Sequence, residues 1–345
     1  MYGFLIALGL VLLVAILWMV YRIQTLLSLA KKSDKKYVSG SNRINAILMM
    51  VFLIGMGILL FWYSIKEFDN YQLPIASEHG VITDRLFWIT TAVTGVVFLI
   101  THILLFWFGY RYQYKENKRA AYYPDNNKLE VIWTLVPALV LTVLVVTGWK
   151  AWSDITSPAP DNAHQIEILG YQFAWEIRYA GRDGQMGEFD YRLISPTNSR
   201  GVNFADKNAL DDFGAQNVVV PKGEPVVFRI RARDVLHSVF VPHMRIKMDA
   251  VPGMPTMFWF VANKTTAEMR EETGDAEFEY ELACAELCGN GHYSMRKIIT
   301  VLEPDEYQRW VAEQATFIEQ DPGLIADLPD ELKELAAIKI SESNK

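Results

Sequence analysis

The chain has 345 residues, of which 51% are hydrophobic, and it carries a formal net charge of −7. The negative charge gathers in the second half, where residues 153–303 hold 22 Asp and Glu against 15 Lys and Arg. This balance excludes nucleic acid as a partner and favours a basic protein.

Apolar residues form four long runs before residue 152, namely Leu5–Val20, Ile44–Trp62, Leu86–Phe108 and Val131–Trp149. A helix of about 20 such residues crosses the ~30 Å hydrocarbon core of a bilayer, so we predict four membrane helices. A cleaved secretory signal is the alternative for the first run, but no basic segment precedes it and no Ala-x-Ala-like site closes it.

The orientation of these helices follows from the charges of the loops between them. Residues 22–43 carry six Lys and Arg and residues 110–130 carry five, whereas residues 65–85 carry two. Basic loops stay in the cytoplasm, so everything after about residue 152 lies outside. We expect a multi-pass protein of the bacterial plasma (inner) membrane, in contact with lipid, with its second half on the periplasmic side.

A proline-bearing segment at 157–163 marks a domain boundary. We predict two N-terminal helices in 1–64, a helix hairpin in 65–152, a linker at 153–164, a β domain in 165–303, and a helix with an acidic tail in 304–345. The β domain is indicated by six strand-like runs, which suggest a sandwich or barrel: Gln165–Tyr179, Asn217–Val220, Pro225–Arg233, Met254–Ala262, Ala276–Cys284 and Lys297–Leu302.

Two of these runs alternate strictly between apolar and charged residues, which predicts their inward faces. In Val226–Arg233 the three arginines lie opposite Phe228 and Ile230. In Ala276–Cys284 the glutamates lie opposite Tyr280 and Leu282, and Cys284 ends the inward face.

The segment Cys284-Ala-Glu286-Leu-Cys288-Gly-Asn-Gly-His292-Tyr-Ser-Met295 concentrates metal-ligand side chains in one loop. Sulfur and imidazole donors select copper or zinc, and a thioether favours copper because zinc rarely uses it. His237, which follows the arginine-rich strand, is the best candidate for a second imidazole.

Two simpler interpretations of this segment stay open. Cys284 and Cys288 are the only cysteines, and an external pair often forms a disulfide. A zinc site of two cysteines and two histidines is the stronger rival, although it leaves Met295 without a role. His79, His164 and His243 have no metal-ligand spacing, and the intramembrane His102 is better explained by a hydrogen-bonded structural role.

Residues 86–304 resemble subunit II of the cytochrome c oxidases. The family's Cys-x-Glu-x-Cys, three residues, His, two residues, Met motif is matched in full, as are the segments Lys128–Pro137, Asp234–Ser238 and Lys247–Gly253. The resemblance implies an all-β cupredoxin-like Greek-key sandwich or barrel. It also implies a subunit that accepts electrons from a c-type cytochrome at a two-copper centre and passes them to haem in subunit I, where oxygen is reduced to water.

The resemblance further implies the ligands of this copper A centre. Two bridging thiolates, two imidazoles, a thioether and a backbone carbonyl would come from Cys284, Cys288, His237, His292, Met295 and Glu286. The Glu286 side chain would bind a magnesium ion shared with subunit I, supported by Asp249, and subunit III would complete the complex. Glu130, whose charge suits a helix start in any case, would stand at a proton entrance into subunit I.

The sequence also departs from the family. In Tyr171-Gln172-Phe173-Ala174-Trp175, Phe173 takes the donor-facing place of a tryptophan, ahead of Trp175, and Arg296 replaces the usual proline. Residues 1–64 add two helices, which either dock another respiratory complex in a membrane supercomplex or simply pack on the oxidase core.

Two rival functions share these features: a copper module of a nitric or nitrous oxide reductase, and a membrane-tethered copper-binding protein. Glu286 and the Glu130–Pro137 segment favour the oxidase, because both serve contacts with its core subunit. A quinol oxidase subunit is disfavoured because that branch lacks the copper ligands.

Overall fold

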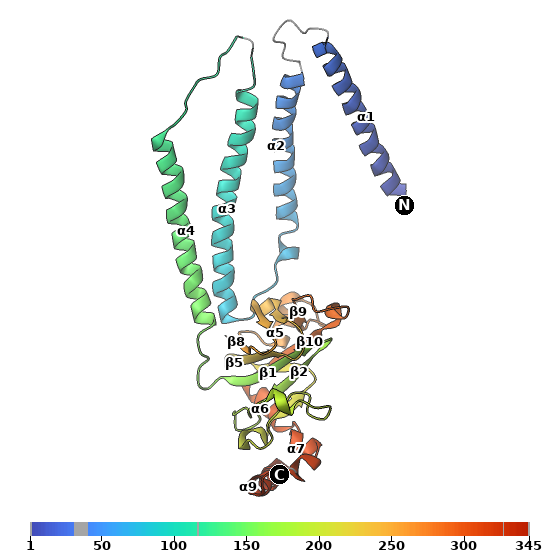
Figure 1. Ribbon diagram of the computed structural model, residues 1–345, viewed down its shortest axis with the longest axis vertical. Helices are drawn as coiled ribbons and strands as arrows, with labels where there is room; N and C mark the ends of the chain where they lie inside the picture. The colour runs from blue at the N-terminus through green and yellow to red at the C-terminus, as the bar shows by residue number, and fades with distance from the viewer. Residues whose placement is uncertain (1, 31–40, 116, 327, 344–345) are drawn as a thin grey trace. The chain divides into compact units, whose positions relative to one another are not determined.

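A computed structural model describes residues 2–30, 41–115, 117–326 and 328–343 (Figure 1). By internal contacts the chain divides into two compact units, Met1–Gln72 with Ile89–Ala138 and Leu73–Trp88 with Leu139–Lys345. The second unit holds all ten strands of the described chain.

Four long helices precede the strands: α1 Tyr2–Ala30, α2 Ser41–Lys66, α3 Glu78–Arg111 and α4 Asn127–Ile155. Of the described helices, α2, α3 and α4 are long and apolar enough to cross a membrane. These three contain the predicted runs from Ile44, Leu86 and Val131. In α1 the described apolar stretch is Val11–Leu27, which is shorter than the ~20 residues of a full span, so the predicted count of four is not confirmed.

The β domain consists of two five-stranded sheets. The first has the order β3 Phe213–Ala215, β2 Ala174–Tyr179, β1 His164–Tyr171, β5 Pro225–Ala232 and β8 Thr256–Val261. The second has the order β4 Val218–Pro221, β10 Arg296–Leu302, β9 Tyr280–Cys284, β6 His237–Val241 and β7 Ile246–Ala250. The pairs β1–β5 and β4–β10 are parallel and the other pairs are antiparallel.

One hydrophobic core joins the inner faces of both sheets, as a sandwich requires. Alternate residues of each strand supply it, among them Ile166, Ile168, Phe228 and Ile230 from the first sheet and Val220, Val239, Tyr280, Leu282 and Ile299 from the second. The alternation predicted for Ala276–Cys284 is therefore correct, although the strand itself begins only at Tyr280.

The predicted strand Gln165–Tyr179 is wrong as a single element, because Tyr171 pairs with Ala174 and the chain reverses between β1 and β2. Gln172 and Phe173 make this turn without a Gly, Pro, Asn or Asp to signal it. Strands β3, β6 and β7 and helix α5, Thr266–Thr273, were not predicted. In β7 the apolar residues alternate with Lys247 and Asp249, but five residues give too short a pattern to recognise alone.

The C-terminal region also differs from expectation. The predicted helix Asp305–Gln320 is two helices, α6 Pro304–Ala312 and α7 Phe317–Gln320. The second starts afresh because Thr316 and Glu319 form a capping box that satisfies its first amides. Helices α8 Gly323–Ala326 and α9 Asp330–Ser343 follow where a short tail was expected.

A buried ion cluster lies on the outer face of the first sheet, on the side where the alternation of Val226–Arg233 places the arginines. Arg178 donates to Glu167 at 2.8 and 3.0 Å and to Asp212 at 2.8 Å, and Arg231 donates to Glu167 at 2.7 Å. Arg231 is buried because its guanidinium also stacks 3.7 Å over the Phe189 ring. Of the three arginines that the alternation places opposite Phe228 and Ile230, only Arg229 is exposed.

Candidate metal centre

Strand pairing brings the two ends of the predicted ligand loop together. Cys284 ends β9 and Met295 immediately precedes β10, and these strands are antiparallel neighbours. The Cys284 amide donates to the Met295 carbonyl at 3.1 Å. The loop between them therefore closes on itself and holds Cys288 and His292 over the end of the sheet.

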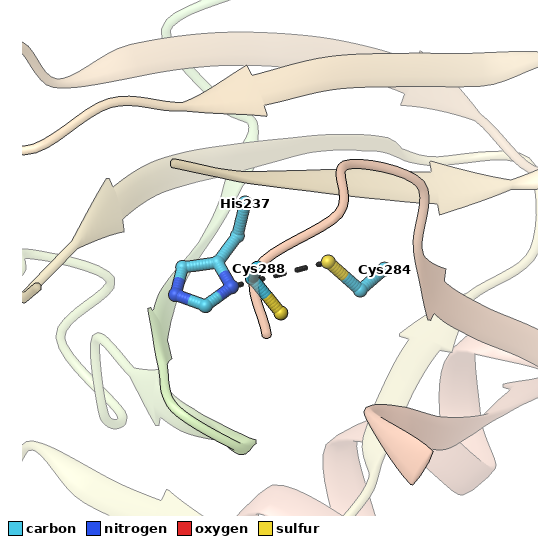
Figure 2. Close-up of side chains that lie close together, drawn as sticks. All are labelled: His237, Cys284 and Cys288. Carbon is cyan, nitrogen blue, oxygen red and sulfur yellow. Dashed lines mark hydrogen bonds between the residues drawn. The ribbon is translucent and has the colours of Figure 1, made fainter. Parts of the chain in front are cut away.

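His237 reaches the same place from a strand that the sequence did not reveal. It starts β6, which pairs with β9 so that Val239 lies opposite Cys284. His237 is completely buried. Figure 2 shows its imidazole beside Cys284 and Cys288, and the ligand atoms of these three residues all lie within 4.8 Å of one another.

All six predicted donor groups meet at the two cysteine sulfurs. Cys284 Sγ lies 3.9 Å from His237 Nδ1 and 3.2 Å from the carbonyl oxygen of Glu286. Cys288 Sγ lies 3.7 Å from His292 Nδ1 and 3.3 Å from the Sδ of Met295. Each cysteine thus has its own imidazole and its own weak ligand.

The geometry argues against both simpler interpretations. The two cysteines are free thiols, so no disulfide joins them. Met295 is 1% exposed and directs its thioether at a thiol, which a zinc site of two cysteines and two histidines would not require. A donor set of three sulfurs and two imidazoles fits copper.

Burial and the neighbouring Cys284 raise the pKa of the Cys288 thiol to about 11. At neutral pH this thiol keeps its proton until a metal displaces it. Metal binding must therefore release protons from the site.

Asp234 and Gln172 are functional residues that the sequence interpretation missed. Asp234 Oδ1 accepts from His237 Nε2 at 2.9 Å, and its Oδ2 accepts from the Gln172 amide at 2.7 Å. Burial raises the pKa of Asp234, but the hydrogen bonds from Gln172, His237 and Val235 lower it overall, so the carboxylate stays charged. Because a carboxylate only accepts, Nε2 carries the proton and Nδ1 is left free for a metal.

Gln172 connects this carboxylate to the ligand loop, since its side-chain amide donates to the Cys288 carbonyl at 2.6 Å. The three-residue spacing of Asp234 and His237 was a visible signal for the carboxylate. Nothing in the sequence places Gln172 at the site, because its two partners, Asp234 and Cys288, lie 62 and 116 residues further along the chain.

The two candidate electron-transfer aromatics lie at different depths. Phe173 is 38% exposed, and a Cβ built on Gly289 or Gly291 would come within 2.9 or 2.4 Å of its ring. The glycines therefore allow the ligand loop to pass directly against Phe173. Trp175 is buried, donates from Nε1 to the Met295 carbonyl at 3.3 Å, and packs edge-on against His237.

The remaining candidates stand outside the donor cluster. Asp249 is exposed and lies opposite Ser238 in the β6–β7 pair, next to His237. Glu286 is half-buried and Glu130 is exposed in the first turn of α4. Among the residues that the structure describes, the group of three or more His, Cys, Asp and Glu that could hold a metal is His237, Cys284 and Cys288, and His79, His102, His164 and His243 do not belong to it.

Comparison with known proteins gives the family. Residues 164–302 match the family described as cytochrome C oxidase subunit II, periplasmic domain, and residues 61–150 match the transmembrane domain. An alternative cytochrome c oxidase subunit 2 from Bradyrhizobium diazoefficiens is 34% identical over 283 residues, which cover 79% of this chain and 93% of that protein.

A second relative carries the same family description. A probable cytochrome c oxidase subunit 2 from Rickettsia felis is 31% identical over 70% of this chain and 69% of that protein. The solved periplasmic domain of subunit II of cytochrome oxidase from Bradyrhizobium japonicum is 25% identical over 45% of this chain and 94% of its own, with a TM-score of 0.31. The chain belongs to the cytochrome c oxidase subunit II family and is the subunit at which electrons enter a haem–copper oxidase.

Proposed function

We propose that His237, Cys284, Cys288, His292, Met295 and the carbonyl of Glu286 hold two copper ions. This centre receives electrons from a c-type cytochrome and passes them to the haem of subunit I. The observation that carries the proposal is the convergence of the donor groups: the two cysteine sulfurs lie within 4.8 Å of each other, and each of the other four groups lies within 3.9 Å of one of them. Family membership implies a copper A site, and the donor set supports a pair because each thiol has a separate imidazole.

When bound, the copper pair supplies one-electron chemistry with the charge shared by two metals. The protein's part is to keep the donors in place. Asp234 orients His237, Gln172 holds the Cys288 carbonyl, and Trp175 holds that of Met295. Donors fixed in this way leave little to rearrange when the charge of the site changes.

We propose Phe173 as the surface group that faces the electron donor, with Trp175 beneath it. Phe173 is a partly exposed aromatic of the β1–β2 turn that packs against the ligand loop at Gly289 and Gly291. The acidic balance of the domain would attract a basic cytochrome to this surface.

Rapid mixing tests this function directly. When reduced c-type cytochrome meets the oxidised complex without oxygen, we expect the copper absorption to change before the haem absorption. Phe173→Ala should slow the first phase, whereas Phe189→Ala, a phenylalanine of nearly equal exposure at 37%, should not. Haem reduction with no earlier change at copper would rule the proposal out.

Glu130 is proposed as a proton entrance to subunit I because it stands exposed in the first turn of α4. If so, Glu130→Gln should lower turnover of the assembled oxidase by about a hundredfold or more, the lower end of the usual effect of losing a proton-transfer group, while electrons still reach copper at the normal rate. If turnover equals that of the wild type at matched assembly, Glu130 has no proton role and only stabilises the start of α4 through its charge.

The chain is a membrane protein with a periplasmic domain. We propose that the membrane is the bacterial inner membrane, that α1 crosses it as a fourth helix, and that subunits I and III pack beside it in the lipid. Residues 1–64 would then dock a donor complex.

We also propose that the half-buried Glu286 carboxylate and the exposed Asp249 serve a magnesium ion at the interface with subunit I. Glu286→Ala should lower the magnesium content of the complex and leave copper in place.

A further inference from the structure

Arg245 has an unusual backbone for a residue with a side chain. It lies in the turn between β6 and β7, with φ of 56°, and it is the only described non-glycine residue with a positive φ. The left-handed conformation brings Cβ close to the backbone and is disfavoured for such residues. It persists only where the surroundings of the residue enforce it.

The surroundings of Arg245 are the segment that leads into α3. Its guanidinium makes a two-pronged contact with Asp84, at 2.6 Å from Nε and 2.9 Å from Nη2. It also donates to the carbonyls of Leu73 and Pro242 at 2.8 and 2.6 Å. One side chain thus ties the start of α3, the segment before it and the β6–β7 turn together.

A second set of contacts joins the same two segments. Ser77 is fully buried, donates from Oγ to the Met244 carbonyl at 2.7 Å and accepts from the Gly80 amide at 3.0 Å. The Ala76 amide donates to the carbonyl of His243 at 2.9 Å, and its carbonyl accepts from Asn263 at 3.0 Å.

Close packing completes these contacts, which together form a joint between residues 73–84 and the β6–β7 turn. A Cβ at Gly80 would lie 2.8 Å from the Ile75 side chain and 3.3 Å from the Arg245 stem, so the helix approaches Arg245 as closely as glycine permits. His79 packs edge-on against Trp259 with ring centroids 4.5 Å apart.

The joint also bears on the metal centre through one strand. Strand β6 runs from the ligand His237 to Val241, and Arg245 lies in the turn that follows. Five residues of extended strand span roughly 16 Å, so Arg245 is too far from the donor atoms to touch them. A change at Arg245 can therefore move the domain without changing the ligands.

We propose that Arg245 is a positioning residue for electron transfer, which fastens the copper domain to the outer end of α3 through Asp84. The inference rests on the proposed function. The copper centre must sit at one fixed distance from its acceptor in subunit I, because electron transfer slows steeply with distance. A domain held only by a linker would sample many distances. The clamp removes that freedom, and the left-handed backbone of Arg245 is what directs its side chain at Asp84.

The test uses the complete oxidase carrying Asp84→Asn or Arg245→Gly. Glycine accepts the left-handed backbone, so this variant removes the clamp without adding strain. After light-triggered reduction of the copper centre, we expect electron transfer to haem to slow by about tenfold or more in both variants, as small misplacements of reacting groups commonly cause. Arg245→Lys, which keeps the charge but cannot make the two-pronged contact, should also slow it.

Two further readouts separate positioning from general damage. The copper spectrum should be unchanged, and hydrogen exchange at the Ala76, Gly80 and Asn263 amides should accelerate in the variants. The control is Glu272→Gln, which breaks the pair between Glu272 of α5 and Lys264 before that helix and should leave the transfer rate at its wild-type value.

Wild-type transfer rates in both Asp84→Asn and Arg245→Gly would overturn the inference. Slowing that appears only together with loss of the copper spectrum would overturn it as well. If copper in the wild-type complex passes no electron to haem, the proposed function fails instead.

Discussion

Cys284→Ser is expected to abolish the two-copper centre, leaving at most about one copper per chain, and Cys288→Ser should do the same. Each thiol has one imidazole and one weak donor beside it. Loss of either sulfur therefore removes the strongest donor from one half of the site. A hydroxyl is a harder and far less acidic ligand than a thiol. Metal analysis and the visible spectrum of the purified complex measure the effect.

Met295→Leu serves as the matched comparison, because it removes the weak thioether ligand while leucine keeps nearly the same side-chain volume. The copper pair should persist with an altered reduction potential. Copper content and spectrum that stay at wild-type values in Cys284→Ser would show that the cysteines do not hold the metal.

Arg178→Leu should destabilise the β domain by about 3–5 kcal/mol, the usual cost of breaking a buried ion pair by removing one partner. Arg178 is 2% exposed and pairs with Glu167 and Asp212, which are 3% and 0% exposed. Loss of the guanidinium leaves Asp212 uncompensated and Glu167 with Arg231 alone. Native-state hydrogen exchange of the β1, β2 and β5 amides in the full chain gives the free energy of opening.

The effect of Arg178→Leu should grow with pH. In the wild type, burial raises the pKa of Asp212 to about 7, although Arg178 opposes this rise. Burial also raises the pKa of Glu167, but Arg178 and Arg231 lower it overall. Without Arg178 both carboxyls hold their protons to higher pH, so the folded state binds more protons than the unfolded chain and stability falls as pH rises.

The loss in Arg178→Leu should therefore be smallest at acid pH and should keep growing above pH 7, where the wild-type Asp212 carboxyl gives up its proton. The control Arg192→Leu breaks an exposed pair with Asp190 and should change stability by less than about 0.5 kcal/mol at any pH. A pH-independent loss in Arg178→Leu would mean that packing, and not charge, decides the effect.

The buried ion cluster shows where inference from sequence stops. Alternation in Val226–Arg233 correctly separates Phe228 and Ile230 from the arginines, because side chains of a strand point to opposite faces in turn. The same rule cannot tell whether the second face meets water. Arg231 is buried because Glu167 and Phe189 cover it, and neither residue is near it in the sequence.

The metal centre likewise has a part that the sequence predicts and a part that only the fold shows. The ligand loop is predictable because four of the proposed donor side chains lie within twelve residues, and soft donors gathered at these offsets seldom serve any purpose but metal binding. His237 was chosen from residue type and the family motif. Its route to the loop depends on β6, whose five residues give too short a pattern to recognise alone.

The groups that hold the ligands are harder still to predict. Gln172 acts through a turn that has no turn signal, and its partners come from two distant segments. The role of Arg245 could not be predicted for a similar reason, since only the fold shows its left-handed backbone and its contact with Asp84.

Electron paramagnetic resonance of the copper-loaded complex tests the central claim most directly, because the spectrum shows how many metals share the unpaired electron. The structure gives each cysteine sulfur an imidazole and a weak donor, so we expect one electron delocalised over two coppers, with a hyperfine pattern from both nuclei. A spectrum of a single copper at full metal loading would contradict the two-copper assignment.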